Sequence, residues 1–259
     1  MCGRMTLTRG GDEIAAYFAE AMAMHALADA AGQLAGRRLK PRFNLTPSQD
    51  LLTLVPALEG TGDLATFAWK RWGLLPSWAK DPSMGQRMFN ARSETVREKP
   101  SFRAAFKRRR CLIPADGFYE WTPRNKDHRP FHFTPTRDAL MAFAGLFESW
   151  TGEEGEVIES CTVLTTEANA DLAGVHHRMP VILDPKDFAT WLDPTVEPEV
   201  LVGLMRSAPA GTLSREAVTR YVNNPRNDDL RCLEPEPKAE QGALFALTPP
   251  EQDPTEEEF

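Results

Sequence analysis

The chain has 259 residues, of which 42% are hydrophobic and 26% are charged. These proportions are typical of globular proteins and exclude a collagen-like or wholly disordered chain. The net charge of −7 is unevenly distributed, because residues 234–259 contain eight acidic residues and one lysine. Residues 1–233 are therefore neutral overall, and the acidic character belongs to the C-terminal tail.

The predicted elements begin with residues 11–39, which are rich in Ala, Met and Leu at helical spacing and predict one or two helices. Short segments rich in β-branched and aromatic residues follow, separated by Pro and Gly, and predict strands of an antiparallel or mixed sheet. These strand segments are 51–58, 65–75, 110–121, 131–135, 140–150 and 160–168, and further helices are predicted at 101–108, 185–192 and 197–206.

The order of these elements predicts a single α+β domain over residues 1–233, with a mixed, mostly antiparallel β-sheet or barrel core and flanking helices. Residues 234–259 are rich in Pro and Glu and contain too little apolar surface to fold, so we expect a disordered acidic tail. No internal repeat interrupts this plan. We therefore expect one globular body, acting as a monomer, and one tail.

Signals for the membrane and for secretion are missing from the sequence. No apolar run approaches the roughly 18 residues that a membrane helix needs. The N-terminal MCGRMTLTRG lacks the apolar segment of a secretory signal. The four cysteines (Cys2, Cys111, Cys161 and Cys232) contain no C-x-x-C pair, which argues against a zinc site or a disulfide framework. We expect a cytoplasmic protein without metal.

A basic block occupies residues 97–110, where seven basic residues accompany one glutamate. Such a block is consistent with a surface that faces phosphates. It is equally consistent with a solvated helix face, and the sequence leaves the two interpretations open.

Cys2 is unusual because removal of Met1 would make it the N-terminal residue. Its α-amine and thiol, with ordinary pKa values of about 8 and about 8.5, would then form a 1,2-aminothiol. The amine of such a group condenses with an aldehyde to a Schiff base, and the thiolate then closes a thiazolidine ring. The alternative is that the residue at position 2 is arbitrary and its thiol inert.

Six short polar motifs lie between the predicted strands, in the order MCGR (1–4), RFNLTPSQ (42–49), WGLLPSWA (72–79), FNARSET (89–95), ADGFYEW (115–121) and HHRMPVIL (176–183). Each combines a turn residue with titratable or amide groups, as loops that form a site do. Through these motifs, from Cys2 to about residue 223, the chain resembles the SRAP family, the SOS-response-associated peptidase-like proteins that cross-link to abasic sites in DNA. The resemblance implies an SRAP-like domain.

Three residues join Cys2 as candidate catalytic groups. The amide of Asn90 could hold the Cys2 amine or a sugar oxygen, or it could cap a turn. Glu120 ends an apolar strand, where it could transfer protons for the Cys2 amine or pair with an arginine. The H-x-R-M-P spacing selects His176 rather than His177, and the resemblance assigns His176 to opening the ribose ring and to reversal.

Candidate DNA contacts lie within the same motifs. Arginines next to the catalytic candidates suggest phosphate contacts, with charge balance for Glu94 and Glu120 as the alternative. Aromatic and proline residues suggest surfaces for stacking or wedging between bases, with core packing as the alternative. The candidate contacts are Arg4, Arg92, Arg178, Pro47, Trp78, Trp121 and, by the resemblance, Thr165.

The tail contains the peptide Gln241-Gly242-Ala243-Leu244-Phe245, of the form Q-x-x-L-F. It is the one apolar island in an acidic stretch and resembles the motif by which short peptides bind sliding clamps. We expect Gln241, Leu244 and Phe245 to contact a clamp.

The sequence and the resemblance together predict an abasic-site sensor that forms a thiazolidine cross-link through Cys2. We expect it to bind single-stranded DNA, including single-stranded DNA at junctions with duplex DNA. The Schiff base also makes β-elimination, an AP-lyase reaction, a side reaction. No metal or organic cofactor is needed. Two alternatives remain: a cysteine peptidase or N-terminal-nucleophile hydrolase that uses Cys2, and a non-catalytic module that binds single-stranded DNA.

Overall fold

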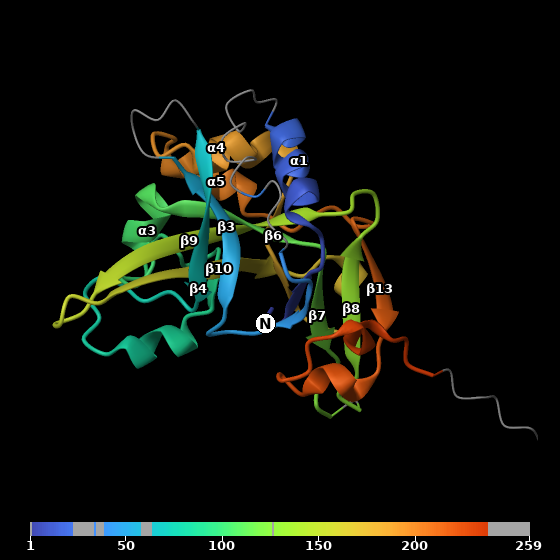
Figure 1. Ribbon diagram of the computed structural model, residues 1–259. Coiled ribbons are helices and arrows are strands. Elements are labelled where there is room, and N and C mark those ends of the chain that lie inside the picture. The colour runs from blue at the N-terminus through green and yellow to red at the C-terminus, as the bar shows by residue number, and fades with distance from the viewer. Residues whose placement is uncertain (1, 23–33, 35–38, 58–63, 126, 238–259) are drawn as a thin grey trace, which may run out of the picture.

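The computed structural model describes residues 2–22, 34, 39–57, 64–125 and 127–237. Two β-sheets form the core, and short helices cover its ends (Figure 1). This is the α+β, mostly antiparallel arrangement that the sequence predicts, in a single domain. Within the described ranges, no helix has the length and apolar character needed to cross a membrane.

Five strands of the larger sheet close into a barrel (left in Figure 1). Neighbouring strands pair around the ring, and β10 closes it by pairing with β9 on one side and β4 on the other. The pairs are antiparallel except β4–β10. The barrel strands are β3 (Asp50–Pro56), β4 (Ala65–Trp72), β6 (Arg110–Ala115), β9 (Met141–Thr151) and β10 (Val157–Glu167).

The C-terminal half of β10 extends beyond the closed ring and carries two short strands. On one side it pairs in parallel with β5 (Asn90–Arg92), and on the other it pairs antiparallel with β11 (Arg178–Pro180). The strand β12 (Ile182–Leu183) follows and pairs with β9. This extension therefore brings the NARSET and HHRMP motifs to the two sides of one strand.

The second sheet has five strands, in the order β13 (Leu213–Ala217), β8 (Pro130–Pro135), β7 (Gly117–Trp121), β1 (Met5–Leu7) and β2 (Arg42–Leu45). The segment predicted as one strand at 110–121 is divided between the two sheets, as β6 and β7. Asp116 lies between the two strands, and its carboxylate accepts hydrogen bonds from the backbone N–H and the hydroxyl of Thr8.

The helices gather at the upper end of the barrel in Figure 1 and along one side. The ring of Phe18 in α1 lies 6.0 Å from Phe67 and 5.5 Å from Phe188, which fastens α1 to β4 and α4. The helical prediction for 11–39 is confirmed over 11–21, and most of its remainder lies outside the described residues. The α-helices are α1 (Gly11–Ala21), α3 (Arg103–Arg108), α4 (Phe188–Leu192) and α5 (Pro198–Leu204).

A C-terminal cover, residues 218–237, packs on the second sheet. The carboxylate of Asp228 accepts hydrogen bonds from Arg42 Nε and from the backbone N–H groups of Phe43 and Asn44, at 2.5, 2.6 and 3.0 Å. Val218 forms a bridge with Pro235. The cover contains the 3₁₀ turns Arg220–Asn223 and Leu230–Leu233. It includes the first residues of the predicted tail; residues 238–259, and with them Gln241, Leu244 and Phe245, lie outside the described residues.

The basic block at 97–110 is partly structural. Arg110 is buried and donates to four carbonyl oxygens at the ends of α3 and α4: Phe106, Lys107, Trp191 and Asp193. Two other arginines of the block, Arg97 and Arg109, pair with Glu199 and Glu148. Arg103, Lys107 and Arg108 remain exposed on α3.

Two glycines pinch the loop that follows β4. Gly73 has a φ of +134°, and a Cβ atom there would lie 2.5 Å from the carbonyl oxygen of Gly85. A Cβ at Gly85 would in turn lie 2.7 Å from the oxygen of Gly73. Only glycine at both positions allows this approach. The loop between them is therefore closed at its base.

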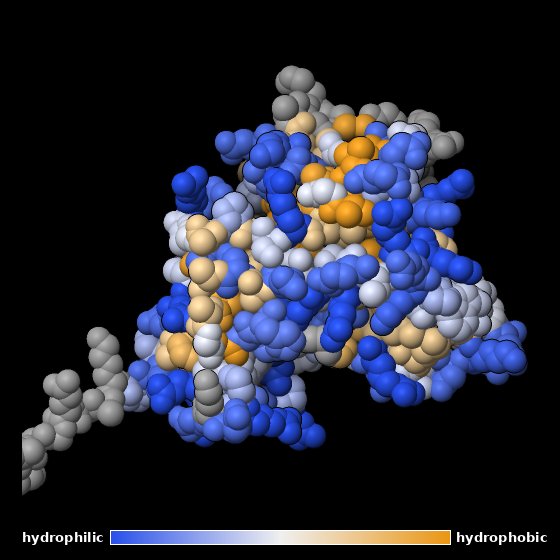
Figure 2. All heavy atoms as spheres, turned by 180° about the vertical axis from the view of Figure 1, so that it is seen from behind, coloured by the Kyte–Doolittle hydropathy of each residue, from blue (hydrophilic) through white to orange (hydrophobic). Residues whose placement is uncertain are grey.

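Hydrophilic side chains cover most of the back face, and apolar ones gather in its upper part (Figure 2). Helix α5 carries two exposed apolar side chains, Val200 and Val202, which are 52% and 41% exposed.

Candidate functional site

Cys2 lies three residues before the start of β1, which pairs with β7 inside the second sheet. Met5 pairs with Phe118, and the backbone N–H of Tyr119 donates to the carbonyl of Arg4. The segment before β1 therefore runs antiparallel to β7. The Cys2 side chain is fully buried. Its carbonyl oxygen accepts a hydrogen bond of 2.7 Å from Asn90 Nδ2 in β5. One hydrogen bond thus joins the N-terminal segment to the extension of the barrel.

Glu120 comes from β7 and belongs to the same group. Side chains alternate along a strand, so Phe118 and Glu120 share one face of β7, and Tyr119 and Trp121 share the other. The Phe118 face enters the main core, which leaves the Glu120 carboxyl 3% exposed. Burial raises the pKa of Glu120 to about 7, because the charged form loses its hydration. Glu120 can therefore take up and release a proton near neutral pH.

His176 approaches Glu120 from the segment before β11. Its Nδ1 lies 3.9 Å from Glu120 Oε1 and accepts a hydrogen bond of 3.0 Å from the backbone N–H of Arg178. Burial lowers the pKa of His176 to about 4, and the neighbouring positive charges act in the same direction. The ring is therefore neutral at physiological pH, which suits a hydrogen-bond donor to a sugar oxygen.

The cysteine thiol itself is strongly affected by this environment. Burial raises the pKa of Cys2, and the negative charge of Glu120 raises it further. A neutral thiol beside a carboxyl group that titrates near pH 7 is the arrangement in which the carboxylate can accept the thiol or amine proton. The structure thus brings together the four residues Cys2, Asn90, Glu120 and His176.

A cavity of about 640 Å³ adjoins this group. It lies between the start of β11 and the end of β10, and it is large enough for a nucleotide-sized ligand. Its lining residues are Arg92, Glu167, Ala168, Asn169, Ala170, Ala173, His176, His177 and Arg178. His177 stacks on His176 with ring centroids 4.6 Å apart. Arg92 is exposed here, where it can reach a ligand phosphate.

Arg178 and Thr165 are structural neighbours rather than exposed groups. The guanidinium of Arg178 donates to both oxygens of Glu94, at 2.6 and 2.9 Å, and to the carbonyl of Thr165 at 2.6 Å. Thr165 is fully buried in β10. The sequence left open that Arg178 balances the charge of Glu94, and the structure contains this ion pair.

Arg4 and Trp121 lie on the other face of β7, under the C-terminal cover. Arg4 donates to Asn44 Oδ1 and to the carbonyl of Val222, and its guanidinium lies 5.6 Å from the ring centroid of Trp121. The indole N–H of Trp121 donates to Asn223 Oδ1 at 2.8 Å. The structure therefore separates these two predicted DNA contacts from the Glu120 face.

Pro47 and Trp78 occupy turns. Pro47 is half-buried between β2 and β3, next to Ser48 with its φ of 73°. Trp78 is 55% exposed in the loop above the glycine pinch. That loop is held from below, because the indole N–H of Trp150 donates to the carbonyl of Ala79 at 2.7 Å. Trp78 is thus a large aromatic surface on an anchored turn.

Asn169 is a lining residue that the sequence analysis missed. Its amide donates to the carbonyls of Ala208 and Pro209, at 3.1 and 3.2 Å, and its Oδ1 caps the 3₁₀ turn Ala170–Leu172. It thereby ties the segment before His176 to residues 206–212. The Asn-x-Asp spacing that begins this turn was the available signal.

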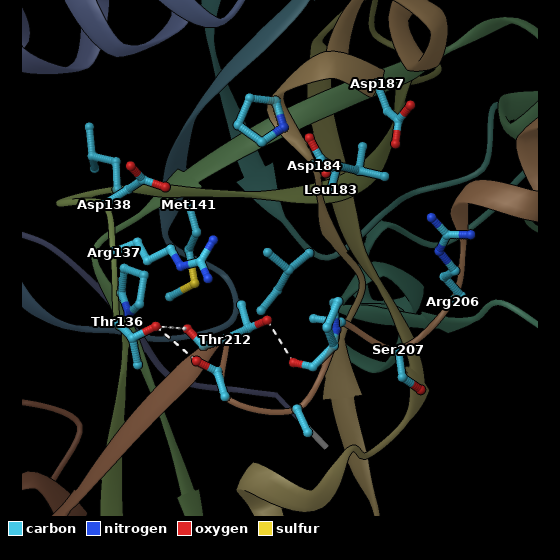
Figure 3. A pocket seen from close by; sticks show the side chains of 18 of the residues that line it. Thr136, Arg137, Asp138, Met141, Leu183, Asp184, Asp187, Arg206, Ser207 and Thr212 are labelled. Carbon is cyan, nitrogen blue, oxygen red and sulfur yellow. Dashed lines mark hydrogen bonds between the residues drawn. The ribbon is translucent and has the colours of Figure 1, made fainter.

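A second cavity, of about 430 Å³, lies away from this group (Figure 3). It is bordered by Tyr17 of α1, by the β8–β9 connection and by residues 206–212. Arg137 and Arg206 lie on opposite sides of it, and Asp138, Asp184 and Asp187 complete its charged rim. Its lining includes none of the predicted site residues. Among the residues described, no cluster of His, Cys, Asp and Glu is suited to hold a metal ion.

Solved structures share the fold. A protein from Bacteroides thetaiotaomicron superposes with a TM-score of 0.75 over 91% of this chain and 100% of that chain, at 19% identity. A protein from Bordetella bronchiseptica gives 0.64 over 85% and 100%, at 24% identity. At these identities the likeness concerns the fold alone.

Sequence relatives are closer. The abasic site processing protein YoqW of Bacillus subtilis is 37% identical over 236 residues, which is 90% of this chain and 99% of the relative. The abasic site processing protein HMCES of Gallus gallus is 35% identical over 193 residues, 64% of this chain and 56% of the relative. The family model of the SOS response associated peptidase (SRAP) matches residues 1–225. From this match and from the relatives' coverage, the chain belongs to the SRAP family.

Proposed function

We propose that this protein processes abasic sites in single-stranded DNA by forming a covalent thiazolidine with them through Cys2, after Met1 is removed. The names of its relatives, abasic site processing proteins, support the substrate class. The observation that carries the proposal is the grouping of Asn90, Glu120 and His176 around the N-terminal segment. The cross-link shields the lesion during the response to DNA damage, and the protein works in the cytoplasm at the nucleoid.

The chemistry needs an amine, a thiol and two proton-handling groups. The ring-opened sugar presents an aldehyde at C1′, and the Cys2 amine attacks it to give a carbinolamine. Loss of water forms the Schiff base; the Cys2 sulfur then bonds to the same carbon, and the thiol proton goes to the nitrogen. The net change is the loss of one water, so no oxidant or cofactor is required.

The surrounding residues fit these steps. The pKa of Glu120, raised by burial to about 7, suits it to take a proton from the amine and return it to the departing water. The neutral His176 ring suits donation of a hydrogen bond to the sugar ring oxygen as it opens. The Oδ1 atom of Asn90 is buried and accepts no hydrogen bond from the described residues, which suits it to hold the Cys2 amine.

DNA recognition is proposed to depend on backbone contacts and stacking, since the lesion has no base to read. Arg92 on the rim of the 640 Å³ cavity is the proposed phosphate contact, and the exposed Trp78 is the proposed stacking surface. A Schiff base at C1′ also acidifies the C2′ protons, so a slow AP-lyase reaction accompanies the cross-link.

The test is denaturing gel electrophoresis of the protein with a single-stranded oligonucleotide that contains one abasic site. A heat-stable, shifted band is expected, and mass spectrometry should find the protein without Met1 and the adduct lighter by one water than its parts. Cys2→Ala and Cys2→Ser keep the α-amine but lack the thiol that closes the ring. Each should therefore give no heat-stable band without reduction and a band only after borohydride reduction.

Two controls make the result specific. Insertion of one alanine between Met1 and Cys2 keeps the thiol but moves it off the N-terminus, and it should abolish the heat-stable band. Cys232→Ser, in the C-terminal cover, should react like the wild type. Absence of a band from protein that lacks Met1 would overturn the proposal. Hydrolysis of a peptide substrate by the same protein, lost in Cys2→Ala, would instead favour the peptidase function.

The tail peptide is a separate part of the proposal. Gln241, Leu244 and Phe245 are proposed to bind a sliding clamp through an apolar pocket. Replacing Leu244 and Phe245 by alanine should abolish co-elution with a purified clamp and leave the cross-linking rate on the oligonucleotide unchanged. Retained co-elution would show that the peptide is not the contact.

A further inference from the structure

Arg178 is held at three points although it lies almost entirely inside the protein, with 7% of its surface exposed. Two bonds reach Glu94 and one reaches the carbonyl of Thr165 in β10. Planar, paired hydrogen bonds between a guanidinium and a carboxylate fix the orientation of both groups. Glu94 itself is 47% exposed in its side chain and follows β5. The pair therefore ties β11 to the segment after β5.

The backbone of the same residue contacts the catalytic candidate His176. The amide N–H of Arg178 donates to Nδ1 at 3.0 Å, which requires a lone pair on Nδ1 and leaves the ring hydrogen on Nε2. The carbonyl oxygen of Arg178 lies 3.1 Å from Nδ1 and would accept only from the opposite tautomer. The amide hydrogen cannot leave its nitrogen, so it would collide with a hydrogen on Nδ1.

We infer that Glu94 is a positioning residue: by clasping the Arg178 side chain it keeps the Arg178 amide on Nδ1 of His176, so that the ring presents Nε2–H to the substrate. The inference rests on the proposed function for the identity of that substrate. Its structural content, the tautomer and its dependence on Glu94, is independent of DNA. We call the Glu94–Arg178 pair the clasp.

The groups that face the His176 ring are consistent with this role. Glu120 of β7 approaches Nδ1 to 3.9 Å, His177 stacks on the ring, and Arg178 adds positive charge from β11. Burial is the main cause that lowers the pKa of His176 to about 4, and the positive charges of His177 and Arg178 act in the same direction, so the ring is neutral at pH 7. A neutral ring whose Nδ1 accepts from the Arg178 amide carries its hydrogen on Nε2, and His176 lines the 640 Å³ cavity, in which we place the sugar oxygen.

The test combines a spectroscopic and a kinetic measurement. In ¹⁵N-histidine-labelled protein at pH 7, the ring nitrogens of His176, assigned by their loss in His176→Gln, should have the shifts of an Nε2–H tautomer. In Glu94→Ala they should move toward a mixture of tautomers, and cross-link formation should slow roughly tenfold, as for other residues that orient a functional histidine. Glu94→Gln keeps one acceptor for Arg178 and should lie between these two proteins.

Glu98→Ala is the matched control, because it removes an exposed glutamate from the same segment without touching Arg178. It should match the wild type in both measurements. Circular dichroism identifies an unfolded Glu94→Ala, in which case Glu94→Gln carries the test. An Nδ1–H tautomer in the wild type would overturn the inference, and so would an unchanged tautomer in a slowed Glu94 variant. If the wild type forms no cross-link, the proposed function fails, while the tautomer measurement still decides the clasp.

Discussion

The two faces of strand β7 hold polar side chains in opposite circumstances. On one face Glu120 is buried among core residues with a pKa raised to about 7, so its charged form destabilises the fold above that pH. On the other face the Tyr119 hydroxyl donates to Phe43 and the Trp121 indole to Asn223, beneath the C-terminal cover. The first face holds a buried carboxyl group whose raised pKa allows proton transfer near neutral pH. On the second face the polar groups form hydrogen bonds that hold β2 and the cover in place.

Glu120→Gln should break this contrast most strongly. The folded pKa of about 7 exceeds the ordinary 4.5, so the stability that the carboxyl group contributes is present below pH 4.5 and lost as pH rises through 7. The amide does not ionise, and the variant should be more stable than the wild type by about 3 kcal/mol above pH 8. Urea unfolding at pH 5 and 8.5 measures this gain. The cross-linking rate should fall roughly 100-fold. Equal stabilities at pH 8.5 would contradict the buried-carboxyl interpretation.

Asp228→Ala should produce the opposite pair of effects on the cover face. It removes the acceptor of two backbone N–H groups and of Arg42, and should lower the free energy of unfolding by about 2–3 kcal/mol. The folded protein should cross-link within twofold of the wild-type rate, because Asp228 does not contact the Glu120 face. Denaturant unfolding and the gel assay check the two statements, with Asp138→Ala as a control on an exposed acid outside the cover.

His132 sharpens the comparison from inside the second sheet. Burial lowers the pKa of His132 to about 4, so the unfolded chain binds a proton that the folded chain excludes between pH 6.5 and 4. Stability should therefore decrease as pH falls through this window, by about 1.4 kcal/mol per pH unit for this group. In His132→Gln the slope should be smaller by that amount. An unchanged slope would mean that His132 is protonated in the folded protein.

Arg92→Gln should have the smallest effect, confined to DNA. Loss of one phosphate contact should weaken binding to single-stranded DNA several-fold at low salt and reduce the slope of log K against log salt by about 0.7. Stability should not change, because Arg92 is exposed. Arg108→Gln, an exposed arginine on α3, is the matched comparison, and an equal loss there would indicate that the basic block also contacts DNA.

Much of the barrel could be predicted because β3, β4, β9 and β10 are long segments rich in β-branched, aromatic and other apolar residues, whereas β1 and β2, with three and four residues, are too short to give a pattern. The sequence also predicted which polar motifs supply Asn90, Glu120 and His176. It proposed Trp121, an aromatic residue in the same motif as Glu120, as a stacking surface for bases, with core packing as the alternative. Adjacent residues in a strand face opposite sides of the sheet, so the side chains of Glu120 and Trp121 point away from each other.

Arg178 illustrates a second limit of the sequence. An arginine next to a candidate histidine suggests a phosphate contact, with charge balance for Glu94 as the alternative, and only the fold decides that Glu94, 84 residues earlier, pairs with the guanidinium of Arg178. Long-range pairs of this kind depend on the register of β11 and β5 on β10, which short strands do not encode locally. Arg92 is exposed on the rim of the 640 Å³ cavity, so its contact with a phosphate stays a prediction.

The pinch between Gly73 and Gly85 has a practical consequence for engineering. Because the two backbones touch at the base of the loop, the residues between them form a module whose exposed positions Ser77, Trp78 and Lys80 can change, while its buried Leu75 and Ala79 stay packed on Trp150. Libraries that vary the exposed positions around Trp78 would change the proposed stacking surface for DNA bases and leave the position of Cys2 unchanged. Either glycine is a poor choice for randomisation, since any side chain there would force the module open.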